Sequence, residues 1–207
     1  VQRGTRATQL QAQGAQWQLD GQTFDAVLLA TSASEADHLL TASAPTAPDP
    51  VAEHMHAWAA MASALRHEAI TTVYAWDSRA ALPAPMLTLR STTVAPAQFV
   101  FDRGQLGGPS GLLAFVVSAS RVERELLQRQ VLAQAHAQLG LQLQAVQTVV
   151  EKRATFACTP GLQRPPQAIA PGLLACGDYV AGPYPATLEG AVRSGLQAVA
   201  GLPHAIR

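Results

Sequence analysis

The chain has 207 residues, and its 14 lysines and arginines balance its 14 aspartates and glutamates. A formally neutral chain with 14% charged residues is neither an electrostatic nucleic-acid binder nor a polybasic membrane anchor. Because 48% of the residues are apolar, the composition also excludes a disordered chain, and the length allows one large domain or two small ones.

The amino-terminal segment has the pattern of short strands. Apolar and polar residues alternate up to Asp20-Gly21, which predicts a tight turn between two strand-like runs. The run at 24–31 is almost continuously apolar, which is typical of a strand buried on both faces in a parallel sheet. We expect a helix to follow, capped by Ser32 or Ser34, with Glu35 in its first turn.

The middle of the chain mixes one helix with several strands. Three prolines at 43–50 predict a linker, and the periodicity of 51–65 predicts a helix. Strands are expected at 70–76, 98–102 and 112–118, with a glycine-rich turn at 104–111. Three close strands joined by loops predict a mostly antiparallel sheet.

A second long helix is predicted at 121–139, with Gly140 as its carboxyl-terminal cap. Its apolar stripe is expected to contain Val122, Leu126, Arg129, Leu132 (with Val131), Ala135 and Leu139. A β-branched run at 146–156 predicts another strand, and four prolines at 160–171 predict loops.

The block at 172–201 carries the most specific pattern of the chain. A short buried strand ends at Gly177-Asp178, a loop follows, and Pro185 opens a helix that runs to about Ala200. The apolar face of this helix consists of Leu188, Ala191, Val192, Leu196 and Val199. Ligands bind beyond the carboxyl ends of strands in open α/β sheets, and a helix amino end suits an electron-rich ligand. Gly190 and Gly195 weaken the helix, so close packing against a cofactor or a strand is expected there.

The residues GDY and YPATLEGAVRSG in this block resemble the carboxyl-terminal flavin-binding motif of the FAD-dependent amine oxidase and phytoene desaturase superfamily. The segment FDAVLLATSASEADHLL resembles an internal strand and helix of that superfamily's FAD domain. The segments ITTVYAWD, AQFVFDRG, LLAFVVSAS and VEKRATFACTPG resemble the squalene-associated desaturases, which include the hydroxysqualene dehydroxylases of hopanoid synthesis. The resemblance covers essentially the whole chain.

The resemblance implies FAD as the cofactor and suggests which residues bind it. Gly177 and Asp178 match the Gly-Asp beside the flavin ribityl and pyrophosphate groups, and Asp178 is expected to accept hydrogen bonds there. The helix amino end is matched by Ala186, Thr187 and Leu188, and the Leu188 N–H is expected to face the pyrimidine carbonyl. A helix amino end stabilises the negative charge that reduction places on that edge. Ala7 matches a position whose backbone meets the adenine.

The chain departs from the superfamily at its amino-terminal dinucleotide motif. No G-x-G-x-x-G is present, and the glycines at 104–111 have the wrong spacing. Together with the start at Val1, this predicts the carboxyl half of an enzyme whose FAD-binding amino half is missing or is a separate polypeptide.

The expected fold class is α/β or α+β, a Rossmann-like FAD-binding domain with an inserted, mostly antiparallel substrate-domain sheet. FAD-domain parts are expected at 1–45 and 151–207, and a substrate-domain part at 46–150.

The function implied by the resemblance is hydride exchange between the flavin and an apolar isoprenoid. For the squalene branch, this reaction is the removal of a hydroxyl group from hydroxysqualene. A carotenoid desaturase, a flavin amine oxidase, and a non-catalytic remnant or partner chain remain as alternatives. The 5% of aromatic residues argues against an amine oxidase, whose substrate site has an aromatic pair. Without a signal peptide or a long apolar run, the chain is expected in the cytoplasm, with contact to the inner membrane through its lipid substrate. No general acid or base can be named.

Other residue patterns favour structural roles. Cys158 and Cys176 match neither a disulfide framework nor a zinc site, and His54 and His56 diverge on a helix and lack a third ligand. Glu189 suits the helix dipole better than catalysis. The helical spacing of Met55, Trp58, Met61 and Leu65 favours core packing over a substrate tunnel. Arg66 and Arg103 are expected to be solvated. Ser110 does not fit the sequence pattern of a hydrolase nucleophile elbow.

Overall fold

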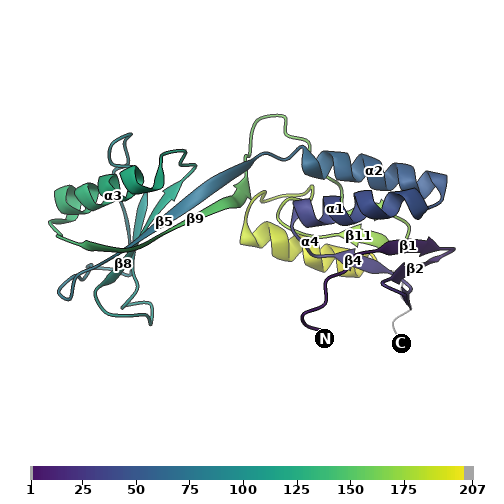
Figure 1. The fold of residues 1–207 in the computed structure, drawn as a ribbon, viewed down its shortest axis with the longest axis horizontal. Coiled ribbons are helices and arrows are strands. Elements are labelled where there is room, and N and C mark those ends of the chain that lie inside the picture. The colour runs from purple at the N-terminus through teal and green to yellow at the C-terminus, as the bar shows by residue number, and fades with distance from the viewer. Residues whose placement is uncertain (1, 203–207) are drawn as a thin grey trace. The chain divides into compact units, whose positions relative to one another are not determined.

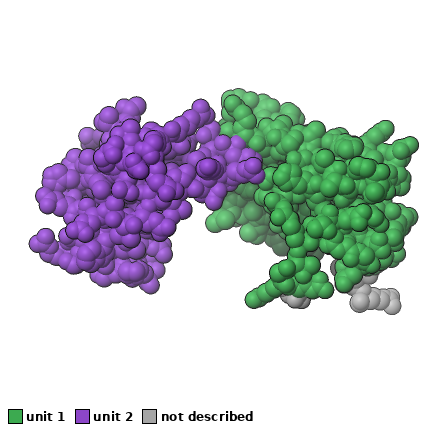
Figure 2. Space-filling model, in the orientation of Figure 1, with its two compact units in different colours: residues 1–66, 156–207 green, residues 67–155 purple. Residues whose placement is uncertain are grey.

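The computed structural model describes residues 2–202 and contains helices together with three β-sheets, which confirms the predicted mixed α/β class. The chain divides into two compact units, coloured separately in Figure 2. Unit 1 comprises Val1–Arg66 and Phe156–Arg207, and unit 2 comprises His67–Thr155. In the described part of the chain, no helix is long and apolar enough to cross a membrane.

The first sheet of unit 1 is an antiparallel meander of β1 (Leu10–Gln13), β2 (Gln16–Leu19) and β3 (Gln22–Phe24). Asp20 and Gly21 connect β2 to β3, and their φ angles of 46° and 86° are both positive. Two successive positive φ angles define the turn that matches the twist of a two-residue hairpin. The predicted Asp20-Gly21 turn is therefore confirmed.

The second sheet has the order β10 (Ala168–Ala170), β11 (Leu173–Ala175), β4 (Val27–Leu29). β4 and β11 run parallel, with Leu173 opposite Val27 and Ala175 opposite Leu29. The predicted buried parallel strand is confirmed, although it is shorter than the apolar run at 24–31. β10 was not predicted, because the four prolines at 160–171 around it indicate loops.

Two helices follow β4, and the predicted linker at 43–50 is wrong. α1 (Ala33–Ser43) continues through a 3₁₀ turn (Ala44–Thr46) almost directly into α2 (Asp49–Ser63). The prolines are accommodated because they stand in the first turns of the 3₁₀ segment and of α2, where a missing N–H costs no hydrogen bond. Ser43 is buried, and its hydroxyl accepts a hydrogen bond of 3.0 Å from the Leu10 N–H.

The hydrophobic core of unit 1 lies among the strands, α1 and α2. Its largest fully buried side chains are Leu10, Leu40, Met55, Trp58 and Leu173. Met55 and Trp58 of α2 and Leu65 just beyond it pack in this core, as the core-packing interpretation expects, whereas Met61 is only partly buried. It also follows that α2 belongs to unit 1, so the boundary expected at residue 45 does not coincide with a boundary between compact units. The cofactor and substrate roles assigned to those parts stay predictions.

Unit 2 is a five-stranded sheet with one long helix. The strand order is β6 (Met86–Thr88), β7 (Phe99–Asp102), β8 (Leu112–Ser118), β5 (His67–Trp76), β9 (Gln144–Phe156). β6, β7, β8 and β5 pair antiparallel, as predicted for this region. One face of the sheet packs against α3 (Arg124–Leu139), visible in Figure 1.

The predicted stripe of α3 is confirmed at Ala135, which is buried, and at Leu132 and Leu139, which pack against the core, but it is wrong in the first turns of the helix. Leu126 is 42% exposed, whereas its neighbour Leu127 is only 1% exposed and packs in the core together with Val131. Apolar residues occur in pairs along this helix, so two stripes one residue apart fit the sequence equally well. Gln134 also faces the core, where its amide bonds the N–H and the carbonyl of Ala97 at 2.8 and 2.9 Å. The predicted cap Gly140 is confirmed by its φ of 70°.

Candidate functional site

The parallel strands β4 and β11 of unit 1 end side by side. The Cys176 N–H, just beyond β11, donates a hydrogen bond of 2.9 Å to the carbonyl of Leu29, the last residue of β4. Ala30–Ser32 and Gly177-Asp178 therefore leave the sheet at the same edge. The crevice beyond the carboxyl ends of parallel strands is the usual ligand site of open α/β sheets.

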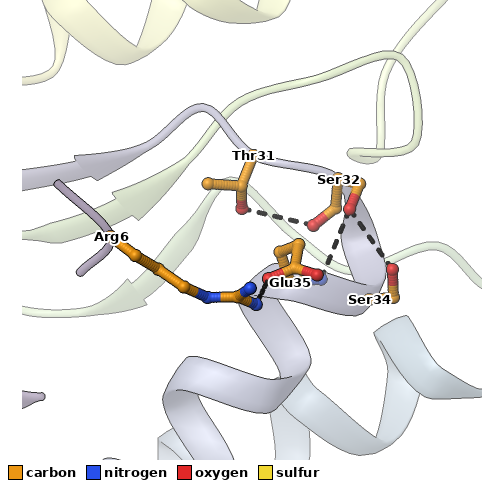
Figure 3. A network of polar contacts seen from close by, with 5 residues as sticks. All are labelled: Arg6, Thr31, Ser32, Ser34 and Glu35. Atoms are coloured by element: carbon orange, nitrogen blue, oxygen red, sulfur yellow. Dashed lines mark hydrogen bonds and ion pairs between the residues drawn. The ribbon is translucent and has the colours of Figure 1, made fainter. Parts of the chain in front are cut away.

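On the β4 side of this edge, Ser32 caps α1, which answers the choice between Ser32 and Ser34. Its hydroxyl accepts from the Glu35 N–H at 3.3 Å and lies 3.2 Å from the Ser34 hydroxyl. Glu35 in turn forms an ion pair with Arg6 (Figure 3). This contact ties the segment before β1 to the start of α1.

Ala7 lies on that tied segment and is exposed. It borders two hollows of about 260 and 190 Å³. The next residue, Thr8, donates to Asp20 from its N–H at 3.1 Å and from its hydroxyl at 2.9 Å. These bonds lower the pKa of Asp20, with the Thr8 backbone making the largest contribution. Among the described residues, no hydrogen bond connects Ala7 with the Gly-Asp loop or the start of α4.

On the β11 side, Gly177 and Asp178 begin the loop toward α4 (Leu188–Ala200). A Cβ on Gly177 would lie 2.5 Å from the Tyr179 ring, so only glycine fits there. The Gly177 N–H donates to the Ser194 hydroxyl at 3.2 Å, which fastens this loop to α4. The Asp178 carboxylate is half-buried and has no hydrogen-bond partner within the described range. It therefore retains its full capacity to accept hydrogen bonds from a ligand.

Thr187 caps the amino end of α4. Its hydroxyl accepts from the Gly190 N–H at 3.0 Å and donates to the Tyr184 carbonyl at 2.7 Å. The same carbonyl explains Gly190, because a Cβ there would lie 2.2 Å from the Tyr184 oxygen. Since the cap uses the Gly190 N–H, the amides of Leu188 and Glu189 stay available, and Leu188 is 88% exposed.

Glu189 forms an ion pair with Arg193, one turn further along α4. This pairing, with the position of Glu189 in the first turn, agrees with a role in helix stability. Gly195 behaves differently from Gly190, because a Cβ at Gly195 would meet no atom within 4 Å. The contacts of this chain therefore give no packing reason for that glycine.

The loop before α4 also contains backbone strain that the sequence pattern did not reveal. Tyr184 and Ala186 have φ angles of 58° and 56°, a left-handed conformation that costs a residue other than glycine about 1–2 kcal/mol. Such strain persists only where the surroundings hold it, and it gathers at ligand sites. The signal in the sequence is faint, since neither residue is a usual left-handed type.

The two cysteines are also candidates, and Cys158 lines a hollow of about 460 Å³ together with Arg164 and Pro185. No group of three metal-ligating side chains occurs in the described residues. Cys158 is exposed and Cys176 is buried, and neither forms a disulfide. Burial raises the pKa of the Cys176 thiol and of the Tyr179 phenol.

Comparison with known proteins defines the class of protein. The family model described as flavin containing amine oxidoreductase matches residues 2–202, and the chain belongs to this family. The family is one of flavoproteins, which confirms FAD as the cofactor at the family level. No curated protein matches the chain.

Among solved structures, the chain is similar to an oxidoreductase from Methanosarcina mazei, with a TM-score of 0.65 and 12% sequence identity. The match covers 94% of this chain and 48% of the other. The chain thus spans about half the length of this structural neighbour. The similarity supports a shared fold.

The residues at the sheet edge fit a flavin. The amides of Leu188 and Glu189 and the positive end of the α4 dipole suit an electron-rich ring edge. The Asp178 carboxylate suits the hydroxyl groups of a ribityl chain. The roles of Gly177, Asp178, Ala186, Thr187, Leu188 and Ala7 in binding FAD stay predictions.

Proposed function

We propose that this chain is part of a FAD-dependent oxidoreductase that reduces a long apolar isoprenoid, namely hydroxysqualene, to the hydrocarbon. The C–O bond of the substrate breaks and a C–H bond forms, so R–OH, two electrons and two protons give R–H and water. FAD, when bound in its reduced form, would supply the two electrons and would itself be oxidised. The chain's own residues hold the cofactor edge, exclude water and accommodate the apolar chain.

The observation that carries the substrate class is the free face of the unit 2 sheet, opposite α3. Cross-strand partners place Phe99, Val116 and Thr72 in one row and Phe101, Ala114 and Tyr74 in the next. Within the paired segments of β5, β6, β7 and β8, the residues of this face are Ile70, Thr72, Tyr74, Trp76, Met86, Thr88, Phe99, Phe101, Leu112, Ala114, Val116 and Ser118, and none of these is charged. Glu68, which precedes them on the same face of β5, is charged and forms an ion pair with Arg121. Trp76, Met86 and Phe99 are between 37% and 47% exposed. A contiguous exposed apolar face is typical of a ligand or interaction surface.

Several residues of unit 1 are assigned to FAD. The Leu188 N–H at the start of α4 would donate to the pyrimidine carbonyl, where the helix dipole favours negative charge. Asp178 would accept hydrogen bonds from the ribityl hydroxyls. Gly177 keeps the loop close to the sheet, because its N–H bonds Ser194 and its missing Cβ admits the Tyr179 ring.

We also propose that the site is completed by a polypeptide carrying G-x-G-x-x-G. The chain lacks that motif, and it spans 48% of its structural neighbour. Two surfaces of unit 1 suit such a partner. β4 is an edge strand of a parallel pair, and parallel strands are usually interior strands. The outward face of α4 is apolar, with Leu188, Val192 and Leu196 exposed. Contact with a membrane surface would follow from the lipid substrate.

The first experiment is the visible absorption spectrum of the purified chain after incubation with FAD and gel filtration. It is repeated with the FAD-binding polypeptide encoded immediately upstream, if one exists. Retained flavin bands support the proposal, and Asp178→Ala should then weaken retention about ten-fold, since a charged hydrogen-bond acceptor is lost. Asp49→Ala, an exposed carboxylate at the start of α2, is the matched control. No retention in any mixture would refute the flavin role.

The substrate class is tested on the flavin-loaded protein. Hydroxysqualene, a carotenoid precursor and an aliphatic amine are compared as substrates under reducing and oxidising conditions. Val116→Asp on the free sheet face should raise KM for the isoprenoid about ten-fold or more, because it buries a charge against an apolar chain. Val94→Asp, at a loop position that is 70% exposed, should leave KM unchanged. Turnover of the amine alone would favour the amine oxidase alternative.

A further inference from the structure

Residues 164–167, with the sequence Arg-Pro-Pro-Gln, form a strap in which every residue makes a hydrogen bond to another part of unit 1. The Arg164 guanidinium donates to the carbonyl of Val180 at 2.9 Å and to that of Gly182. The Pro165 carbonyl accepts from the Ala181 N–H at 2.8 Å, and the Pro166 carbonyl accepts from the Trp58 indole at 2.7 Å.

The last residue of the strap reaches two further elements. The Gln167 amide donates to the Ser194 carbonyl in α4 at 2.9 Å, and the Gln167 carbonyl accepts from the Ala175 N–H in β11 at 2.8 Å. The two prolines restrict φ, so the strap enters the folded state with little conformational freedom to lose. The strap thus links the core helix α2, the strand β11 and the helix α4 to the loop at 179–187.

This loop needs external support. It contains the left-handed residues Tyr184 and Ala186, and it includes no strand or helix of its own. Its bonds to the strap are the two from Arg164 and the one from Pro165. Arg164 forms no ion pair with any described carboxylate, so its guanidinium is used on loop carbonyls alone.

We propose that Arg164 is a positioning residue that fixes the loop at 179–187, and through it the Leu188 and Glu189 amides, in the conformation that receives the flavin edge. This inference rests on the proposed function. A planar guanidinium reaches two carbonyls at once, whereas an ammonium group offers a single point of contact. The loop would otherwise relax toward ordinary φ angles and turn the start of α4 away.

Amide hydrogen exchange of the purified chain tests the positioning without FAD. Arg164→Met keeps most of the side-chain length and removes the donors, and Arg164→Lys restores one of them. We expect the hydrogen-bonded loop amides of Val180, Ala181 and Ala186 to exchange about ten-fold faster in Arg164→Met and at an intermediate rate in Arg164→Lys, while amides of β4 and β11 keep their rates. Arg79→Met, whose side chain is 91% exposed in unit 2, is the matched control.

Flavin affinity provides the second readout. Where the unvaried chain or its mixture retains FAD, Arg164→Met should raise Kd about ten-fold, with partial recovery in Arg164→Lys. Unchanged exchange at the amides of Val180, Ala181 and Ala186, equal acceleration in β4 and β11, or a loosened loop with unchanged Kd would each overturn the proposal. If the unvaried chain and its mixture retain no FAD, the proposed function fails, and the exchange rates still decide whether Arg164 holds the loop. If Arg164→Met does not fold, Arg164→Lys carries the same comparison.

Discussion

The helices α3 and α4 both carry large apolar side chains but place them in opposite ways. α3 turns large side chains such as Leu127 and Val131 into the core of unit 2. α4 packs through the small residues Gly190, Ser194 and Ala198, and its large apolar side chains point outward. An apolar stripe therefore does not by itself tell whether a helix buries that stripe in its own chain, because α3 buries large side chains and α4 leaves its large side chains exposed.

The physical reason for the difference is the approach distance. Small residues let α4 lie close to the loop at 179–187, so that Gly190 touches the Tyr184 carbonyl and Ser194 reaches Gly177. Close approach of backbones brings the amino end of the helix to the sheet edge, where a ligand can meet its free amides. In α3 the buried side chains serve core packing, and large side chains are needed there because they fill the space between the helix and the sheet.

The largest expected effect is a difference in the free energy of unfolding between variants of α3 and α4. Leu127→Ala removes a fully buried side chain, and we expect the free energy of unfolding to fall by about 2–4 kcal/mol. Leu196→Ala removes a side chain that is 68% exposed, and we expect a change below about 0.5 kcal/mol. Urea denaturation of both variants measures the contrast.

The same two variants also test whether a partner binds to the outward face of α4. In the presence of an FAD-binding polypeptide, Leu196→Ala should weaken complex formation while Leu127→Ala acts on folding alone. Equal destabilisation by both variants in the isolated chain would mean that α4 is packed within it, contrary to the exposed face described above.

A second contrast concerns two carboxylates, Asp102 at the end of β7 and Asp178 in the loop after β11. Asp102 follows Phe101 at the end of β7 and is 3% exposed; it accepts bonds from the Leu82 N–H at 3.1 Å and the Gly104 N–H at 3.0 Å. The Gln105 side chain at 2.9 Å lowers the pKa of Asp102 most strongly, and the Leu82 N–H lowers it further. Asp178 has no such partners among the described residues.

Asp102→Asn should therefore lower the free energy of unfolding by about 2–3 kcal/mol at pH 7, because several charged hydrogen bonds are lost. The folded-state pKa lies below the ordinary value of 3.8, so this stabilisation is complete above that pH and is lost as pH falls through the folded pKa. Unfolding measured from pH 7 down to pH 2 should show a smaller decline for the variant. Asp178→Asn should change stability little, and a large loss would reveal a structural role for Asp178.

The sequence predicted the parts of the fold that follow from local chemistry. The Asp20-Gly21 turn, the Ser32 cap and the Gly140 cap are encoded by residues that act within one turn of the chain. The parallel pairing of β4 was also predictable, since its side chains are apolar on both faces.

Features that depend on distant partners could not be predicted. The rotation of α3 depends on which of two adjacent leucines meets the sheet, and Gln134 faces inward because Ala97 supplies its hydrogen bonds. At the candidate site, the motif identified the Gly-Asp pair and the start of α4. The left-handed Tyr184 and Ala186 and the strap around Arg164 lie outside any local pattern, because contacts from separate segments hold them.

The smallest expected effects come from the two glycines of α4, and they have opposite signs. Gly190→Ala places a Cβ 2.2 Å from the Tyr184 oxygen, so the loop or the helix must shift, at about 1–3 kcal/mol of stability. Gly195→Ala meets no atom within 4 Å, so the isolated chain should gain up to about 1 kcal/mol from the better helix former.

If a partner binds to the outward face of α4, Gly195→Ala should have an unfavourable effect on that binding. A methyl group at Gly195 would then stand where another backbone approaches, and the variant should bind that partner more weakly although it folds more stably. Thermal unfolding of the isolated chain and co-elution with the FAD-binding polypeptide measure the two quantities separately. A Gly195→Ala variant that is more stable and binds the partner equally well would leave the glycine without a packing role and would place the contact surface elsewhere on unit 1.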